Sequence, residues 1–419
     1  MAYMKLWDVV VVGGGASGMM AAGRAAADGA SVLLLEKNKT LGNKLAISGG
    51  GRCNITNAEF DERALLGHYG AAEQFLYSPF SQFGVQSTFD FFAALGLPLV
   101  VQARKRAFPN TQKAPDVVRA LKKYLKQGKV EVRTGILVKG FVTEGGRITG
   151  VKTPQETIPS KSVILSTGGN SHPETGSTGE GFMWLKAIRH KIKDSNPTIV
   201  PLKVEDPWVH GLSGTSLTFM KITFFSGGKK AFSKTGKLLF THFGLSGPLI
   251  LNSAYEVGEL LEDGPVTAKI DMYPDTDLGA LDKKILGVID ANKNKDFKNL
   301  LDGIVPHGLD KTIEAMMSFK DRHLKAHSVT ASERKKLVHL LKAMPVTITG
   351  LMGFDRAVIS DGGVMLDEID TRTMRSRLWD NLYCTGDILN INRPSGGYSL
   401  QLCWTTGFVA GKSAAEAKN

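Results

Sequence analysis

The sequence predicts an α/β fold: a discontinuous Rossmann-like domain, with a β-rich region and a helical region inserted between its two halves. Two observations lead to this prediction. The first is a short, wholly apolar run near the start of the chain, which passes through a glycine-rich turn into an alanine-rich helix. The second is that short strands followed by glycines recur through the first 195 residues and return after residue 345. The residues between these two parts have a different pattern of apolar and polar side chains.

The first 36 residues read as one strand–helix–strand unit. Residues 8–12 (DVVVV) are typical of a strand that is buried on both faces of a parallel sheet. An alanine-rich helix is expected from Gly18 to Ala27, and residues 31–35 (SVLLL) are expected to form the next strand. This order predicts a βαβ unit at the start of the fold.

The turn between the first strand and the helix reads GGGASG at residues 13–18 and fits the pattern GxGxxG. Gly13 permits the tight turn, Gly15 lets a pyrophosphate approach the backbone, and Gly18 lets the helix pack on the sheet. Glu36 ends the second strand, where a carboxylate binds the 2′-hydroxyl of an adenosine ribose. A 2′-phosphate would be repelled there, so the motif predicts FAD or NAD rather than NADP. A purely structural strand–turn–helix is the alternative.

Further elements complete the first half of this domain. A helix is expected over residues 116–127, because Pro115 stands at its start and Gly128 at its end. Its apolar residues form one stripe, so most of its lysines should face solvent. The strands expected after it are a hairpin, 129–142 with 148–151, and a buried strand, 163–166.

The pattern of apolar and polar residues changes after residue 195. Residues 198–274 alternate apolar and polar side chains with many glycines and read as antiparallel strands, whereas 278–342 read as helices. Short strands then return, ending in 381–384 (NLYC), and a last helix is expected from about Tyr398. The expected domains are therefore a discontinuous one, 1–195 with 345–419, and two inserted regions, 196–277 and 278–344.

A second set of glycine turns favours FAD over NAD. Asp387 follows Thr385 and Gly386 after the expected strand, where its carboxylate can bind the ribityl hydroxyls of a flavin; capping a turn is the alternative. Gly396 and Gly397 precede the last helix, whose first amides can stabilise the negative charge of a reduced flavin. A similar close-approach turn follows residues 163–166. No second strand–GxGxxG–helix unit occurs, so NAD(P)H is expected to bind only transiently as the electron donor; another source of electrons is the alternative.

Residues 48–54 (SGGGRCN) are too rich in glycine to pack a core. The glycines remove side chains, which lets a cofactor lie against the backbone. Cys53 follows Arg52, whose charge could lower the pKa of the thiol and keep it reactive. A structural role beside the flavin is the alternative for Cys53. The segment therefore predicts where the reacting half of the cofactor lies.

The composition excludes several classes of protein. The chain has 419 residues, of which 42% are hydrophobic, and no apolar run approaches the roughly 20 residues that a membrane helix needs. Only three cysteines occur, without a CxxC pair, so neither a disulfide framework nor a metal site is expected. The first residues lack the features of a secretory signal. A cytoplasmic enzyme without a membrane partner is expected, and the sequence does not predict its oligomeric state.

Positive charge is concentrated in one part of the chain. The formal net charge is +12, and residues 101–139 alone hold eleven Lys and Arg against two acidic residues, a net charge of +9. A solvated helix face is one interpretation. The other is a docking surface for a polyanion such as RNA. The side chains expected to contact RNA are Lys105, Arg119, Lys122, Lys123 and Lys126.

The motifs taken together resemble a bacterial family of NAD(P)/FAD-dependent flavoproteins, often described as aminoacetone-oxidase-like. The resemblance spans essentially the whole chain and depends on VVVVGGGASG, SGGGRCNITN, STGGNSHPETGSTGEG, FTHFGLSGP and TGDILNINRPSGGYSLQ. It implies a glutathione-reductase-type FAD domain with an inserted β-barrel-like part and a helical part. The cofactor-binding residues that it implies are Gly13, Gly15, Ala16, Ser17, Gly18, Glu36, Lys37, Lys44, Ser48, Gly49, Gly50, Arg52, Cys53, Asn54, Val138, Thr167, Gly168, Gly386, Asp387, Gly396, Gly397 and Tyr398.

The resemblance leaves the substrate open, because its members act on small molecules or, in some cases, reduce uridine in ribosomal RNA. The basic segment favours ribosomal RNA or its precursor, since phosphates around the cleft must be neutralised. A small-molecule oxidase or reductase, and a flavin-holding RNA-binding protein without turnover, are the alternatives. Cys53 and His242 are the two candidate acids for protonating the reduced carbon. Arg52 and Arg106 are candidates for holding a substrate oxygen.

Overall fold

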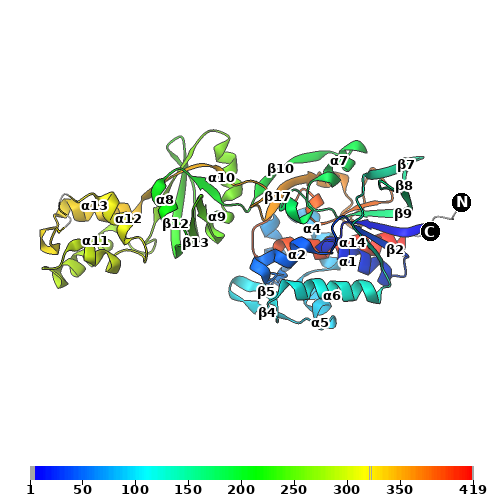
Figure 1. Cartoon of the computed structure of the whole chain (residues 1–419), viewed down its shortest axis with the longest axis horizontal. Coiled ribbons are helices and arrows are strands. Elements are labelled where there is room, and N and C mark those ends of the chain that lie inside the picture. The colour runs from blue at the N-terminus through cyan, green and yellow to red at the C-terminus, as the bar shows by residue number, and fades with distance from the viewer. Residues whose placement is uncertain (1–4, 320, 322, 418–419) are drawn as a thin grey trace. The chain divides into compact units, whose positions relative to one another are not determined.

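The computed structural model describes residues 5–319, 321 and 323–417. It divides the chain into two compact units, which are coloured by residue number in Figure 1. The first unit runs to Pro197 and resumes at Phe354, and the second is Thr198–Gly353. The chain thus has a discontinuous unit, as expected, but the two inserted regions form a single unit.

The first unit is built around a seven-stranded sheet in the order β6-β2-β1-β9-β8-β7, with β18 also paired to β9. Strands β6, β2, β1, β9 and β18 are parallel, and the apolar residues of β1, β2, β9 and β18 are buried, as the sequence predicts for a parallel sheet. The strands are β1 (Trp7–Val12), β2 (Val32–Glu36), β6 (Glu131–Thr134), β7 (Gly140–Glu144), β8 (Arg147–Lys152), β9 (Thr157–Leu165) and β18 (Leu382–Cys384).

The hairpin expected from residues 129–142 and 148–151 is wrong in its first strand. The structure divides 129–142 into β6, which joins the parallel edge beside β2, and β7, which pairs with β8. Gly135 (φ +72°) and Gly140 (φ +144°) adopt backbone conformations that interrupt a single strand. The antiparallel pair β7–β8 then continues through β9.

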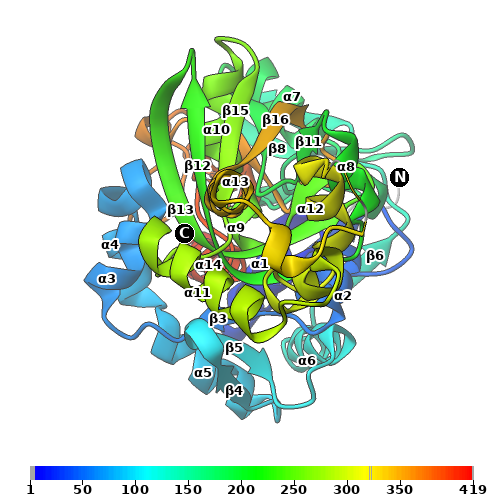
Figure 2. The ribbon, with the colours of Figure 1, turned by 90° about the vertical axis from the view of Figure 1, so that its left-hand side faces the viewer.

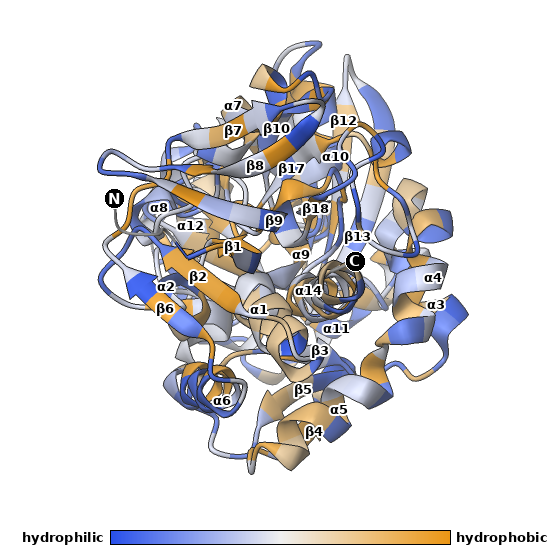
Figure 3. Cartoon of the chain, turned by 90° about the vertical axis from the view of Figure 1, so that its right-hand side faces the viewer, coloured by the Kyte–Doolittle hydropathy of each residue, from blue (hydrophilic) through white to orange (hydrophobic). Residues whose placement is uncertain are grey.

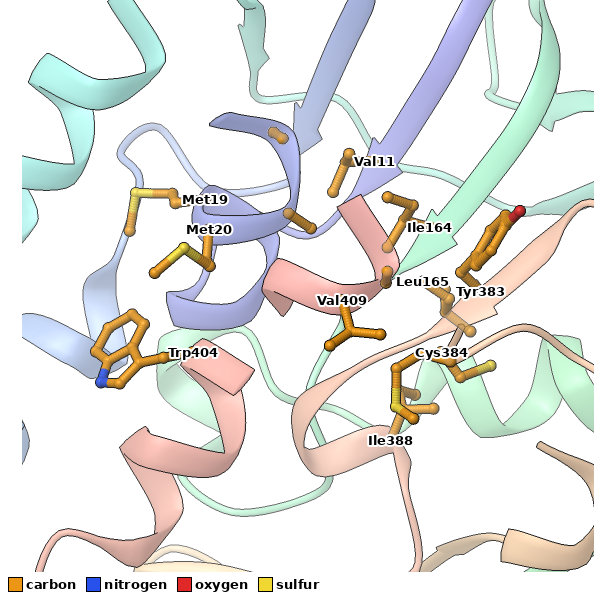
Figure 4. Packing of buried hydrophobic residues seen from close by; sticks show 14 of the residues in the cluster. Val11, Met19, Met20, Ile164, Leu165, Tyr383, Cys384, Ile388, Trp404 and Val409 are labelled. Atoms are coloured by element: carbon orange, nitrogen blue, oxygen red, sulfur yellow. The ribbon is translucent and has the colours of Figure 1, made fainter. Parts of the chain in front are cut away.

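Two helices from opposite ends of the chain pack against each other and against this sheet. They are α1 (Ala16–Ala27) and α14 (Tyr398–Glu416). A side chain at Gly407 would come within 2.5 Å of the Ser17 carbonyl oxygen, and one at Gly411 would collide with Ala21, so glycine permits the close crossing. Figure 4 shows the resulting core, in which Met20 and Trp404 lie among the buried side chains.

Helix α6 (Ala114–Gln127) packs its apolar stripe against α1. Val117 and Leu121 are fully buried, and Tyr124 packs against Gly23 of α1. The helix also contacts α2 (Asn43–Ile47) and the glycine-rich turn η1 (Ser48–Gly51). Figure 3 shows hydrophilic and hydrophobic residues together on α6, in agreement with the predicted stripe.

A small antiparallel sheet, β3-β5-β4, lies in the same unit. Its strands are β3 (Thr56–Asn57), β4 (Leu99–Gln102) and β5 (Arg106–Pro109), with the turn η3 (Ala103–Lys105) between the last two. The helices between β3 and β4 are α3 (Glu62–Leu66), η2 (Gly67–Ala72), α4 (Glu73–Gln82) and α5 (Val85–Ala94). The remaining elements of the unit are η4 (Pro173–Thr175), α7 (Glu180–Ala187), β10 (Ile192–Thr198) paired with β17 (Ile359–Val364), η7 (Leu366–Glu368) and η8 (Gly386–Ile388).

The second unit contains a closed six-stranded barrel, in the order β11-β14-β13-β12-β15-β16. Its strands are β11 (Leu202–Val204), β12 (Ser216–Ser226), β13 (Lys229–Thr241), β14 (Gly244–Ser246), β15 (Val266–Asp271) and β16 (Met344–Leu351), and its short helices are α8 (Pro207–Gly211), α9 (Pro248–Leu251) and α10 (Ala254–Leu261). Because β16 closes the barrel, the first unit resumes at Phe354 and not at the expected residue 345.

Helices follow the fifth barrel strand, as predicted for residues 278–342. They are α11 (Leu278–Ala291), η5 (Phe297–Gly303), α12 (Asp310–Met317), η6 (Ala326–Ser328) and α13 (Ala331–Lys342). Helix α13 begins with a capping box between Thr330 and Glu333 and contacts β15 and β16; Figure 2 shows these helices with the barrel strands. Within the described part of the chain, no helix has both the length and the apolar character that crossing a membrane requires.

Candidate functional site

The turn between β1 and α1 has the geometry of a phosphate-binding loop. Gly13 has φ +107°, and a side chain there would collide with the Ser166 backbone. Gly15 faces open space, with no atom within 4 Å of an added Cβ. No side chain caps the start of α1 and no acidic residue lies in its first turn, so its amides are available to an anion. The turn therefore fits the diphosphate of a dinucleotide, in line with the predicted roles of residues 13–18.

Glu36 is fixed at the carboxyl end of β2. Its Oε2 accepts a hydrogen bond from the Gly14 amide at 2.7 Å, and its Oε1 accepts one from the Asn38 amide at 2.8 Å. The two bonds hold the carboxylate directly beside the glycine turn, and each oxygen keeps a further lone pair for a hydroxyl. Val138, one of the cofactor-binding residues that the resemblance implies, is buried.

The two lysines expected at the cofactor make different contacts. The Lys37 ammonium lies 2.6 Å from Glu180 at the start of α7 and donates to Thr178, so it is engaged within the protein. The Lys44 ammonium lies 3.1 Å from the Ser171 hydroxyl and 3.5 Å from the Asp387 carboxylate. The structure thus brings Lys44, from α2, to the residue expected at the ribityl chain.

Asp387 is paired with a buried arginine that sequence reasoning did not select. The Arg393 side chain is 0% exposed and forms an ion pair with Asp387, while it also donates to the Ile391 carbonyl and the Ser399 hydroxyl. Burial raises the pKa of the Asp387 carboxyl, but the charges of Arg393 and Lys44 outweigh it, so the pKa lies below its ordinary value. The carboxylate is thereby kept ionised. An arginine six residues after a buried Asp, within a turn rich in Pro and Gly, is the sequence signal that could have found it.

Two buried polar atoms in the expected cofactor loops are without a partner among the described residues. They are Oδ1 of Asn54, which precedes β3, and Oγ1 of Thr167, which follows β9. A buried polar group without a hydrogen bond costs roughly 1–3 kcal/mol, so such atoms are normally satisfied by a ligand or water. The loop at Thr167 lies close to the phosphate turn, because a Cβ added at Gly13 would lie 3.1 Å from the Cα of Thr167. Both atoms fit a polar cofactor that lies along these loops.

The start of α14 is held against β3 by two glycines. Gly396 and Gly397 have φ +130° and +106°, and a side chain at Gly397 would collide with the Thr56 backbone. The Asn57 side chain donates to the Gly396 carbonyl at 3.2 Å. The first amides of α14, from Tyr398 onward, therefore lie beside the small sheet. The expectation that they stabilise the negative charge of a reduced flavin stays a prediction.

An aromatic pair stands at this helix start. The His68 ring lies 4.9 Å from the Tyr398 ring, and the Tyr69 hydroxyl donates to the Tyr398 carbonyl at 2.9 Å. His68 is exposed. The sequence analysis did not select His68, and no local pattern could have distinguished it, because Tyr398 is more than 300 residues away.

The glycine-rich turn η1 has the open backbone that the sequence predicts. Gly49, Gly50 and Gly51 have φ values of +58°, +67° and +81°, and side chains at the last two would meet nothing within 4 Å. Cys53, with φ +59°, is fully buried, and burial raises the pKa of its thiol to about 12. The expectation that Arg52 lowers this pKa is therefore wrong. The residue is a protonated, buried thiol at neutral pH.

Arg52 turns away from Cys53 toward the small sheet. Its guanidinium stacks on the Phe108 ring at 4.2 Å and donates to the side-chain oxygens of Gln102 and Gln112 at 2.6 and 2.5 Å. Arg106 lies on the same sheet, in β5; burial, and then the charge of Arg104, lower its pKa. The structure thus brings together both arginines that the sequence predicted as oxygen-binding groups. Their contact with a substrate stays a prediction.

His242 follows β13 in the second unit, where its ring packs on Phe243 at 4.8 Å. Cys53, the other candidate acid, belongs to the first unit. The assignment of His242 to proton transfer stays a prediction. Among the described residues no cluster of His, Cys, Asp and Glu could hold a metal ion.

The basic residues differ in how far they are neutralised. Lys105 is paired with Glu59 and Arg119 with Asp116, and Lys123 donates to the Leu95 carbonyl. All five predicted RNA-contact side chains are exposed. Lys122 and Lys126, one turn apart on α6, have no ion-pair partner among the described residues. These two lysines therefore carry the least compensated charge of the predicted RNA-contact set.

Comparisons with known proteins identify the family of the chain and two relatives that match it over nearly the full length. Residues 7–413 match the family described as HI0933-like protein Rossmann domain. A Clostridium scindens protein named 3-dehydro-bile acid delta(4,6)-reductase is 30% identical over 401 residues, 94% of this chain and 95% of the relative. The ribosomal RNA dihydrouridine synthase of Escherichia coli is 26% identical over 418 residues, 99% and 100% of the two chains.

A solved structure shows the same fold at lower identity. The 3-ketosteroid delta1-dehydrogenase of Sterolibacterium denitrificans superposes with a TM-score of 0.56 at 16% identity, over 98% of this chain and 99% of that one. The family match confirms the resemblance seen in the motifs. The phosphate turn, the buried carboxylates and the two unpartnered polar atoms all fit FAD. The chain therefore belongs to the HI0933-like protein Rossmann domain family and is an FAD-dependent oxidoreductase.

Proposed function

We propose that this flavoenzyme reduces the C5–C6 double bond of uridine in ribosomal RNA, with NAD(P)H as a transient electron donor. The observation that carries the proposal is the exposed basic face of α6, because the same helix contacts η1 through its buried side. A full-length relative named ribosomal RNA dihydrouridine synthase supports the same substrate class. The alternative expectation of a merely solvated helix does not explain why the cationic face belongs to the helix that contacts η1, the turn expected to lie along the flavin.

The reaction must add two electrons and two protons to one carbon–carbon bond. Uridine, NAD(P)H and a proton give dihydrouridine and NAD(P)⁺, so the hydride arrives at C6 and the proton at C5. Bound FAD would supply the two-electron hydride chemistry. The chain itself has to orient the base, exclude water and provide the proton.

The residues of the first unit are suited to holding the cofactor. The α1 amides and the turn at Gly13 would bind the diphosphate, Glu36 the adenosine ribose, and Asp387 the ribityl chain. Asn54 and Thr167 offer buried polar atoms that still need a partner. The glycines of η1 leave one face of the loop without side chains, which gives a planar base room to stack.

The basic face of α6 would act on the RNA backbone. Each phosphate contact releases counterions, so affinity falls steeply with salt, by about 0.7–0.9 in the log–log slope per contact. A uridine in folded RNA must also leave its stack to reach a flavin, at a cost of a few kcal/mol. Neutralising the flanking phosphates offsets that cost.

The proposal is tested by incubating the FAD-loaded protein with NADPH or NADH and unmodified ribosomal RNA, then mapping dihydrouridine. The diagnostic variant is Lys122→Glu with Lys126→Glu. Its matched control is Lys229→Glu with Lys230→Glu, two exposed lysines at the β12–β13 hairpin, outside the basic segment 101–139. We expect the α6 variant to lose at least tenfold in RNA affinity and to reduce the salt slope by about 2, whereas the control changes neither. RNA that stays unmodified with both donors would refute the proposal.

A second candidate function has its own support. The Clostridium scindens relative is named as a bile-acid reductase, and a steroid dienone and uracil share a carbon–carbon double bond conjugated with a carbonyl. Supplying a 3-keto-4,6-diene steroid in place of RNA distinguishes the two. Turnover of the steroid together with unmodified RNA would establish the small-molecule reaction.

A further inference from the structure

Arg52 fixes two glutamine side chains from separate segments in one orientation. Gln102 ends β4, and Gln112 follows β5 and directly precedes Lys113, the N-cap of α6. One nitrogen of the Arg52 guanidinium, Nη2, donates to both carboxamide oxygens, at 2.6 and 2.5 Å. The two amides therefore converge on a single atom and lie side by side. The stack of the guanidinium on Phe108, which is buried, keeps that atom in place.

This arrangement leaves the NH₂ groups of the two glutamines as hydrogen-bond donors for a ligand. Their oxygens are committed to a charged donor, so the amide groups turn their NH₂ ends away from the arginine. No hydrogen bond from Nε2 of Gln102 or Gln112 is present among the described residues. Gln112 is exposed and Gln102 partly so. The pair is thus a set of adjacent, pre-oriented hydrogen-bond donors at the protein surface.

Gln102 belongs to the small sheet that meets the start of α14, and Gln112 follows the strand β5 of that sheet. Strand β5 pairs with β3 at Asn57, and the Asn57 side chain donates to the Gly396 carbonyl, directly before α14. In the chain, Gln102 is followed by the basic run 104–106 (RKR), and Gln112 by Lys113. Two neutral donors are therefore flanked in the chain by cations, and Arg52, which binds both of them, directly follows η1.

We propose that Gln102 and Gln112, oriented by Arg52, bind the two carbonyl oxygens of a uracil base and select uridine over cytidine. The inference rests on the proposed function. Uracil carries carbonyl acceptors at C2 and C4, on both sides of N3, and so complements two donors. Cytosine carries an amino donor at C4, which would face a donor and leave both unpaired. A steroid with one ring ketone would need only one of the two amides.

Replacing glutamine by glutamate tests this without breaking the bridge. In Gln102→Glu or Gln112→Glu, a carboxylate still accepts from Arg52 but no longer donates to a ligand. The probes are hexauridylate and hexacytidylate, and the readout is the ratio of their dissociation constants. We expect the wild-type protein to bind hexauridylate at least tenfold more tightly. The glutamate that faces the C4 position should lower this ratio tenfold or more, because it accepts from the cytosine amino group.

The controls separate recognition from charge and from folding. Gln155→Glu, an exposed glutamine of the same unit, makes the same charge change and should leave the ratio unchanged. Urea unfolding of each variant reports whether the Arg52 bridge persists. A wild-type protein without preference, or glutamate variants with the wild-type ratio, would overturn the inference. A protein that prefers hexauridylate yet leaves ribosomal RNA unmodified would keep the inference and lose the proposed function.

Discussion

A buried Ser–His–Glu network in the first unit should be among its largest single contributors to stability. The His190 side chain is 0% exposed; its Nδ1 lies 2.7 Å from Glu368 and its Nε2 lies 2.9 Å from the Ser376 hydroxyl. Ser376 also accepts hydrogen bonds from two backbone amides, at Leu378 and Trp379. Ser376 is itself buried and bonded on every side, so the trio is a structural network and not a hydrolase triad.

Replacing His190 by Ala should therefore destabilise the protein by about 3–5 kcal/mol. The change leaves the buried Glu368 carboxylate with one partner fewer, which costs several kcal/mol for a charge, and leaves the Ser376 hydroxyl without its acceptor, about 1–3 kcal/mol. Partial compensation between the two groups keeps the total below their sum. Urea unfolding followed by intrinsic fluorescence, with wild type and variant fitted to the same slope, measures the difference.

The control is His307→Ala, because the His307 side chain is fully exposed. That variant should stay within about 0.5 kcal/mol of wild type. A loss below about 1 kcal/mol for His190→Ala would show that the network is not required, and the reasoning would fail. A double-mutant cycle with Ser376→Ala should give a coupling free energy of about 1 kcal/mol or more.

The same network gives stability a pH dependence of known sign. Burial lowers the pKa of His190 below its ordinary value of 6.5, although Glu368 opposes the shift. The unfolded chain therefore takes up a proton at a higher pH than the folded protein. Stability is complete above about pH 6.5 and falls as the pH drops below it, and this part of the slope should be missing in His190→Ala. Urea midpoints between pH 8 and 5.5 measure it.

Three further predictions concern the cofactor site. Gly397→Ala should yield protein that cannot retain FAD, because the new Cβ collides with the Thr56 backbone at positive φ; retained yellow colour after gel filtration would contradict this. Asp387→Asn should weaken FAD binding about tenfold or more by fluorescence titration, since Arg393 then lacks a countercharge. Cys53 and the other two thiols should resist alkylation at pH 8 until the protein is unfolded, because burial raises each pKa to about 12.

The nucleotide-binding half of the fold could be predicted because its motifs are local. The run ending at Val12, the turn at residues 13–18 and the carboxylate of Glu36 lie within 36 residues, and each has one backbone geometry that suits it. The glycine-rich turn η1 was predictable for the same reason. Positive φ angles at Gly49–Gly51 are a property of glycine itself.

The rest depended on contacts between distant residues, which spacing cannot reveal. The barrel takes β16 as its closing strand, so the boundary at residue 345 was placed too early. Cys53 lies beside Arg52 in sequence, but folding buries the thiol and turns the guanidinium to Gln102 and Gln112. His68 meets the ring of Tyr398 only because α14, at the other end of the chain, folds beside it.

The crossing of α1 by α14 has a consequence for how the protein is made. Strand β18 and helix α14 complete the nucleotide-binding unit, yet both follow the whole inserted unit in the chain. At about 5–20 residues per second, the N-terminal half must wait through the synthesis of Thr198–Gly353 before its sheet can close. The inserted unit can fold in the meantime, whereas the exposed apolar edge at β9 stays open to misassociation. Loading of FAD should therefore follow the synthesis of α14.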